Sequence, residues 1–309
     1  MLIREVPRAE LSARLCGDGV HLDTGAFCVR LRIEWPLLAD EFATMYAPYR
    51  MQDPPGIDDA CIEIVRAPGM RRVFDRRAWV RTDGGPMIEP VPVERAFTAL
   101  ESALNWTLAY NGVAPLVMHA AALERNGRAV LMPAPSGSGK STLTAAMSWR
   151  GWRLFTDEMS VFRFEDLALV PNPRPVSLKN EAIDVLRRYE PRAVLSPVYR
   201  GTHKGDVAYM RAPDDAVARS GLTAPVGWVV VPTWRAGARA ELRPMPRREA
   251  FRWLVDSTVN YASTLHHGFD LLSGIVEHCR LYSLTYSDLD EAIALLDRLA
   301  RNEQVTDAP

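Results

Sequence analysis

The feature that most constrains the fold is a glycine-rich segment at residues 134–142, which reads Ala-Pro-Ser-Gly-Ser-Gly-Lys-Ser-Thr. It matches the phosphate-loop pattern Gly-x-x-x-x-Gly-Lys-Ser/Thr except at its first position, where Ala134 replaces glycine. Glycine admits backbone conformations that a Cβ penalises, so the amides of such a loop can converge on phosphate oxygens. A strand-like segment at 128–133 precedes the loop and a helix-like segment at 141–149 follows it. The sequence therefore predicts an α/β domain that binds a nucleotide.

The side chains of the loop suit the chemistry of a nucleoside triphosphate. Lys140 provides a positive charge for the β- and γ-phosphates, and the hydroxyl of Ser141 is a suitable ligand for Mg²⁺. We therefore expect ATP and Mg²⁺ as cofactors. The expected nucleotide contacts are Ser136, Gly137, Ser138, Gly139, Lys140, Ser141 and Thr142.

Two adjacent acids, Asp157 and Glu158, follow a strand-like segment at 152–156. If the sheet is parallel, the end of this strand faces the same crevice as the phosphate loop. Adjacent strand residues point to opposite faces, so one acid would hold Mg²⁺ and the other would point elsewhere. We list Ser141, Asp157 and Glu158 as candidate metal ligands. His119, on the strand-like segment 116–123, is by chemistry alone a candidate core residue.

Taken together, these residues resemble the HPr kinase/phosphorylase family. The resemblance consists of a strand carrying His119, the loop at 136–141, a helix ending in Arg150-Gly151 and a short strand closing on Asp157-Glu158. Within that family the closer resemblance is to the branch called HPr-kinase-related kinase A. It is carried by segments 151–158, 174–180, 202–205 and 260–261, and it covers roughly residues 92–300.

The resemblance implies a P-loop kinase core of the HPr kinase/PEP carboxykinase-like type and a serine kinase acting on a protein or peptide. On that basis Asp157 is the general base, His119 lies near the phosphate, and Lys140 completes the catalytic set. The sequence departs from the family at Glu158, where the family has Asp. We find no counterpart of the family's C-terminal loop for the reverse reaction. Its later Glu-x-Arg-Gly-type metal segment is also missing, and Glu181 is only a weak substitute for it.

Other interpretations stay open at this level. The chain could be a nucleotide-binding regulatory protein without phosphotransfer, or a kinase for a small-molecule hydroxyl. Arg174, Lys179 and Lys204 are candidate contacts for the phosphate or for an acidic acceptor, although surface charge explains them equally well.

The remaining patterns predict a small N-terminal α+β domain at 1–91, a kinase domain with C-terminal helices at 92–302, and a frayed tail at 303–309. In the first domain we expect strands at 19–23, 26–33, 60–66, 72–74 and 78–81 and a helix at 36–46. A long amphipathic helix at 92–110 links the two. Residues 194–218 are polar and predict an irregular loop, and helices are expected at 180–189, 247–255, 268–279 and 287–301.

Composition excludes several classes of partner. The net charge of −1 provides no basic field for nucleic acid, and no stretch approaches the roughly 18 apolar residues of a membrane span. Cys16, Cys28, Cys61 and Cys279 are scattered, which is typical of reduced thiols. We expect a cytoplasmic protein whose partner is a protein or peptide with an acceptor serine, and a homo-oligomer is left open.

Overall fold

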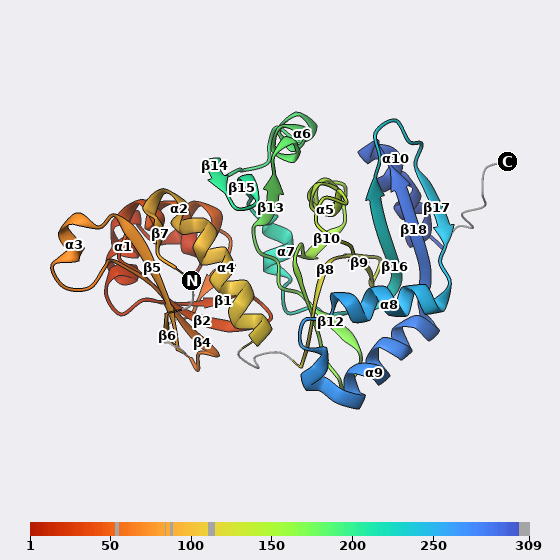
Figure 1. Cartoon of the computed structure of the whole chain (residues 1–309), viewed down its shortest axis with the longest axis horizontal. Helices are drawn as coiled ribbons and strands as arrows, with labels where there is room; N and C mark the ends of the chain where they lie inside the picture. Colours follow the sequence, from red (N-terminus) through yellow and green to blue (C-terminus); the bar gives the residue numbers. More distant parts are fainter. Residues whose placement is uncertain (53–55, 84, 87–88, 111–114, 303–309) are drawn as a thin grey trace.

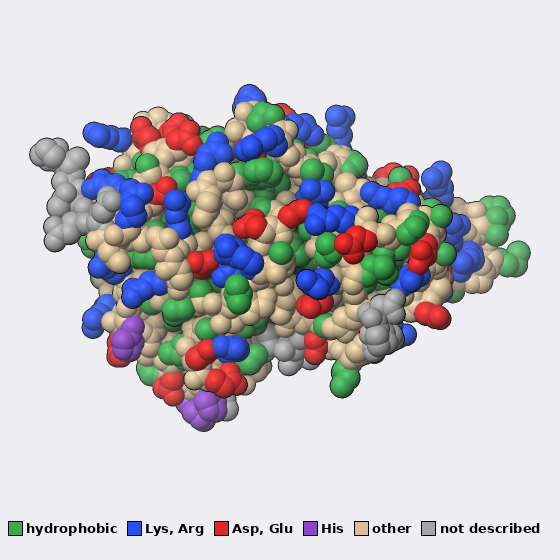
Figure 2. Space-filling view, turned by 180° about the vertical axis from the view of Figure 1, so that it is seen from behind, with side chains coloured by type: hydrophobic (Ala, Val, Ile, Leu, Met, Phe, Trp, Pro, Cys, Tyr) green, Lys and Arg blue, Asp and Glu red, His purple; other side chains and the backbone are tan. Residues whose placement is uncertain are grey.

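The computed structural model describes residues 1–52, 56–83, 85–86, 89–110 and 115–302. It is a mixed α/β structure with three sheets. In Figure 1 the N-terminal sheet lies at one end of the long axis, and a larger sheet with its covering helices occupies the other end. Seen from behind, Lys and Arg side chains are interspersed with Asp and Glu over the whole face, in keeping with the net charge of −1 (Figure 2).

The N-terminal sheet is mixed, with β2 and β4 parallel and its other neighbours antiparallel. Its strands are β1 (Val20–Asp23), β2 (Cys28–Ile33), β3 (Arg50–Met51), β4 (Ala60–Val65), β5 (Arg77–Thr82), β6 (Gly85–Pro86) and β7 (Val91–Pro92). Its helices are α1 (Arg8–Cys16), α2 (Pro36–Met45), α3 (Arg71–Phe74) and α4 (Ala96–Tyr110). The strand predicted at 72–74 is wrong, because these residues form the short exposed helix α3.

The large sheet carries the phosphate loop, and it is mixed, whereas the placement of the acids was argued for parallel strands. Only β16 runs parallel to its neighbours β9 and β18, and the other pairs are antiparallel. The strands are β8 (Leu116–Arg125), β9 (Arg128–Pro133), β10 (Arg153–Thr156), β11 (Met159–Phe162), β12 (Ala168–Val170), β16 (Ala224–Trp234), β17 (Glu241–Pro244) and β18 (Arg280–Tyr286).

Helices cover both faces of this sheet because its central strands are apolar on both sides (Figure 1). In β8, Val117 and Ala121 pack with helices α5 (Lys140–Ser148) and α10 (Leu289–Ala300). The alternate residues Met118 and Ala122 pack with α8 (Arg247–Ser257) and α9 (Tyr261–His278). By this alternation, His119 lies on the α5 side of the sheet.

Part of the segment predicted to be an irregular loop belongs to a third, three-stranded sheet. This sheet contains β13 (Val176–Lys179), β14 (Tyr199–Thr202) and β15 (Gly205–Met210), and it is flanked by α6 (Glu181–Tyr189) and α7 (Asp214–Ala218). The loop prediction for 194–218 is therefore wrong. None of the helices in the described ranges is long and apolar enough to cross a bilayer.

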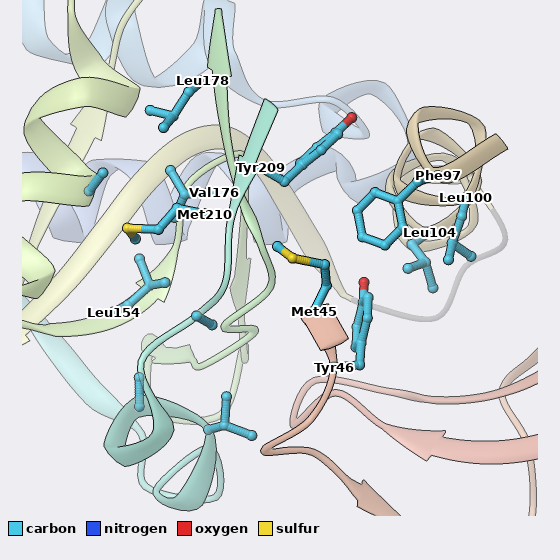
Figure 3. Close-up of a cluster of buried hydrophobic side chains, with 14 of the residues drawn as sticks. Met45, Tyr46, Phe97, Leu100, Leu104, Leu154, Val176, Leu178, Tyr209 and Met210 are labelled. Carbon is cyan, nitrogen blue, oxygen red and sulfur yellow. The ribbon is translucent and has the colours of Figure 1, made fainter. Parts of the chain in front are cut away.

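Helix α4 joins the N-terminal sheet to the rest of the chain. Figure 3 shows Phe97, Leu100 and Leu104 on one face of α4, close to Tyr46 at the end of α2 and to Tyr209 of β15. These side chains are fully or almost fully buried in one continuous apolar cluster. The same cluster contains the buried apolar residues of α5, namely Leu143, Ala145, Ala146 and Met147. The N-terminal part is therefore packed directly against the part that carries the phosphate loop.

Candidate phosphate-binding site

The phosphate loop occupies the turn between β9 and α5, and two neighbouring strands hold it in place. The Trp234 amide donates to the Ser138 carbonyl at 2.8 Å, and the Tyr286 hydroxyl donates to the Gly139 carbonyl at 3.0 Å. Gly137 and Gly139 both have φ of +86°, a left-handed conformation that favours glycine. The first turn of α5 thus begins at a loop with a fixed backbone, and a helix N-terminus attracts anions.

Lys140 is the first residue of α5, and its charge is unusually placed. The residue is only 7% exposed, and Nζ has no hydrogen-bond partner among the described residues. Burial lowers the pKa of Lys140, while the nearby carboxylates of Asp157 and Glu158 oppose that change. A buried ammonium without a partner is costly, so the site favours an anion that would contact Nζ.

Asp157 and Glu158 lie in the bend between β10 and β11, and they have different environments. Asp157 is 4% exposed; its Oδ2 accepts from the Ser177 amide at 3.3 Å, and its Oδ1 has no partner in the described part of the chain. Burial raises the pKa of Asp157 to about 6, although Lys140 and the Ser141 hydroxyl act in the opposite direction. Asp157 is therefore a buried carboxyl group with one oxygen uncommitted.

Glu158 faces the cavity beside the loop and accepts a hydrogen bond from the Asn105 side-chain amide. Burial by itself raises the pKa of Glu158, but the positive charges of Lys204 and Arg174 outweigh it and bring the pKa below its usual value. Glu158 is therefore a carboxylate at neutral pH.

His119 lies opposite Met159 in the pairing of β8 with β11, so it is next to the acid bend. Its side chain is exposed and lines the cavity. Partial burial and the nearby Lys140 ammonium lower the pKa of His119, which makes a neutral imidazole the form present at pH 7.

The loop, Glu158 and His119 line one cavity of about 650 Å³. Among the predicted acceptor contacts, Lys179 and Lys204 also line it. Arg174 does not: it is 6% exposed and forms an ion pair with Glu101 at 3.3 Å. The buried position of Arg174 therefore argues against the contact with phosphate or acceptor predicted for it. Asp157 is likewise not among the residues that line the cavity.

Several residues of the cavity were not predicted. The polar ones are Ser177, Asn180, His203 and Ser287, and the largely apolar ones are Pro135, Ala182, Val185, Trp234, Tyr286 and Leu289. Glu181, considered above only as a weak substitute for the metal segment, also lines the cavity. Trp234 and Tyr286 end the two strands β16 and β18 that run parallel with β9. A correct assignment of these two strands would have placed both residues beside the loop.

The donor set around Ser141 is compatible with Mg²⁺ held jointly with phosphate. In the described ranges no three His, Cys, Asp or Glu side chains come together as a cation site. Mg²⁺ in phosphate-transfer sites usually takes only one or two carboxylates and completes its shell with water and phosphate oxygens. The uncommitted Asp157 Oδ1 fits that requirement.

Comparisons with known proteins add little to this geometry. None of the family models and none of the curated proteins that were compared matches the chain. Among solved structures, the HPr(Ser) kinase/phosphatase from Coxiella burnetii aligns with 60% of this chain and 94% of its own, at 15% identity and a TM-score of 0.26. A likeness of this size carries no argument about fold or activity, so the function is argued below from the residues.

Proposed function

We propose that this chain is an ATP-dependent kinase that transfers the γ-phosphate to a serine-type hydroxyl on a protein or peptide. The observation that carries the proposal is the buried Nζ of Lys140 at the start of α5, together with the buried Asp157 carboxyl group. Neither this Nζ nor the Oδ1 of Asp157 has a hydrogen-bond partner among the described residues. A triphosphate would supply the anion that this ammonium lacks. The fixed backbone of residues 136–141 would supply amide donors for the same phosphates.

Bound Mg²⁺ would neutralise charge on the β- and γ-phosphates during transfer. Ser141, Asp157 and Glu158 are the residues that would hold it. Ser141 and Glu158 line the cavity, and Asp157, which directly precedes Glu158 in the bend after β10, has one oxygen without a partner in the described part of the chain.

In the proposed reaction the acceptor oxygen bonds to the γ-phosphorus while the bond from that phosphorus to the β–γ bridging oxygen breaks. The electron pair leaves with ADP, and the hydroxyl proton passes to a base. We assign Asp157 as that base, because burial raises its pKa to about 6 and a base needs a pKa near the working pH. Glu158, which already faces the cavity, is the competing candidate.

Lys179 and Lys204 are proposed to contact the acceptor or the transferred phosphate. Both line the cavity beside Glu158, and neither makes an ion pair within the described ranges. Two such ammonium groups favour an acceptor with acidic side chains close to its serine.

The experiment is incubation of the protein with a cell lysate and γ-labelled ATP, followed by identification of labelled species by mass spectrometry. We expect Lys140→Ala to lose ATP binding, and Asp157→Asn to keep ATP binding and lose transfer. If Asp157→Asn still transfers phosphate while Glu158→Gln does not, the base is Glu158. Label on a small metabolite would favour a small-molecule hydroxyl as acceptor.

A nucleotide-binding regulatory protein without phosphotransfer is the second candidate. The observation that favours it is the burial of Asp157 away from the cavity lining. ATP binding that depends on Lys140, with no label transferred to any species in the lysate, would support this candidate over the kinase.

A further inference from the structure

A line of buried polar contacts connects the N-terminal part of the chain to Glu158. The Tyr46 hydroxyl donates to one oxygen of Glu101 at 2.5 Å, and the other oxygen of Glu101 pairs with Arg174 at 3.3 Å. Arg174 donates to the side-chain oxygen of Asn105, and the Asn105 amide nitrogen donates to Glu158. Glu101 and Arg174 are 4% and 6% exposed, so water competes little for these groups.

The chemistry of these groups fixes the direction of each hydrogen bond. A guanidinium has only donors, so Arg174 requires the oxygen of the Asn105 amide. The amide NH₂ is thereby turned towards Glu158, which as a carboxylate can only accept. Arg174 therefore determines which end of the Asn105 amide faces Glu158, and Asn105 commits one of the two oxygens of Glu158.

We infer that Asn105, oriented by Arg174, is a positioning residue that holds the Glu158 carboxylate for its role at the phosphate site. The inference rests on the proposed function of Glu158 and adds a dependence on the N-terminal part. Helix α4, which carries Asn105 and Glu101, packs on β4, β5 and α2 as well as on β11. The position of the Glu158 carboxylate thus depends on how α4 packs between the N-terminal sheet and the sheet that carries the phosphate loop.

A purely structural role for the same contacts would predict a different result. Buried ion pairs often contribute little net stability. If these contacts served only to stabilise the fold, removing them would weaken ATP binding, metal binding and transfer alike. A positioning role affects the site selectively. Residues that orient metal ligands typically change metal affinity or activity by about 10- to 100-fold when they are replaced.

The test compares Asn105→Asp with the exposed substitution Ser102→Ala one turn earlier on α4. Asn105→Asp keeps the acceptor for Arg174 but faces Glu158 with a second negative charge. Asn105→Leu is the second variant, since it cannot donate and adds no charge. Thermal unfolding first confirms that each variant is folded, and two titrations follow: ATP alone, and Mn²⁺ into the ATP-saturated protein, read by electron paramagnetic resonance.

We expect ATP affinity within about threefold of the wild type, a Mn²⁺ affinity reduced about 10-fold or more, and a matching loss of transfer. Glu158→Gln should show the same loss, and the double variant should lose little more, because coupled residues are non-additive. The inference is overturned if Asn105→Asp and Asn105→Leu behave like Ser102→Ala, or if their losses add fully to that of Glu158→Gln. If the wild type transfers no phosphate, the proposed kinase fails, but the Mn²⁺ titrations still decide the role of Asn105.

Discussion

Replacing Gly139 by alanine tests two constraints on this residue of the phosphate loop: its left-handed backbone conformation and the close packing of its neighbours. Gly139 has φ of +86°, which costs an L-residue about 1–2 kcal/mol. An added Cβ would also lie 2.5 Å from the Tyr286 hydroxyl and 2.8 Å from the Trp234 Cβ. Forcing extra atoms into a packed site typically costs about 1–3 kcal/mol more. We therefore expect Gly139→Ala to lower the free energy of unfolding by about 2–5 kcal/mol.

Gly137 provides the matched control, because it has the same φ of +86° and nothing within 4 Å of its added Cβ. Gly137→Ala should cost only the conformational part, about 1–2 kcal/mol. The assay is urea unfolding without nucleotide, so that contacts with phosphate do not enter. In the Gly139→Ala background, Tyr286→Phe removes the nearest clashing atom and should recover part of the loss. Equal losses for the two alanine variants would refute the packing around Gly139 described here.

Two further predictions concern the contact between the N-terminal part and the rest of the chain. Phe97 is fully buried, and its ring centroid lies 5.2 Å from that of Tyr209. Phe97→Ala should therefore lower the free energy of unfolding by about 3–5 kcal/mol and leave a single cooperative transition in urea. Two separate transitions would contradict a shared core. Burial raises the pKa of Glu101 to about 7 from an ordinary value of 4.5, so the unfolded chain loses this proton first as pH rises. The stability that this group contributes is complete below about pH 4.5 and is lost towards pH 7, by up to ~3 kcal/mol. Urea unfolding should show a smaller decline between pH 5 and 7 in Glu101→Gln than in the wild type, and an unchanged decline would contradict the raised pKa.

Local sequence signals predicted those elements whose determinants lie within a few residues. Asn126-Gly127 is a pair typical of two-residue hairpins, and it joins β8 to β9 with positive φ at both residues, 55° and 78°. The strand, loop and helix around Lys140 were predicted for the same reason, since glycine positions and apolar runs are local features. The helix predicted at 92–110 is observed as α4, preceded by the short 3₁₀ turn Val93–Arg95.

Elements that depend on distant partners could not be predicted in this way. Strand β14 looks polar in sequence because only its first residue, Tyr199, is buried, and the ring of Phe97 that stacks on Tyr199 lies on α4. The sequence left Arg174 open equally as a phosphate or acceptor contact and as surface charge, because nothing near it in sequence indicates its partner. Its partner Glu101 is 73 residues away in the sequence, and the two residues meet only when α4 packs in its place in the folded structure.

The strands that carry the phosphate loop and the acid bend are not the neighbouring parallel strands considered from the sequence. The loop and the acids were expected to meet because neighbouring parallel strands end at the same edge. In the structure β8 lies between β9 and β10 and is antiparallel to both, with Ala120 opposite Pro133 and Ala122 opposite Thr156. Two successive reversals make β9 and β10 run in the same direction, so both still end at the edge where β8 passes His119. His119 therefore owes its place to the antiparallel strand β8, which brings an imidazole to the cavity that the loop and Glu158 also line.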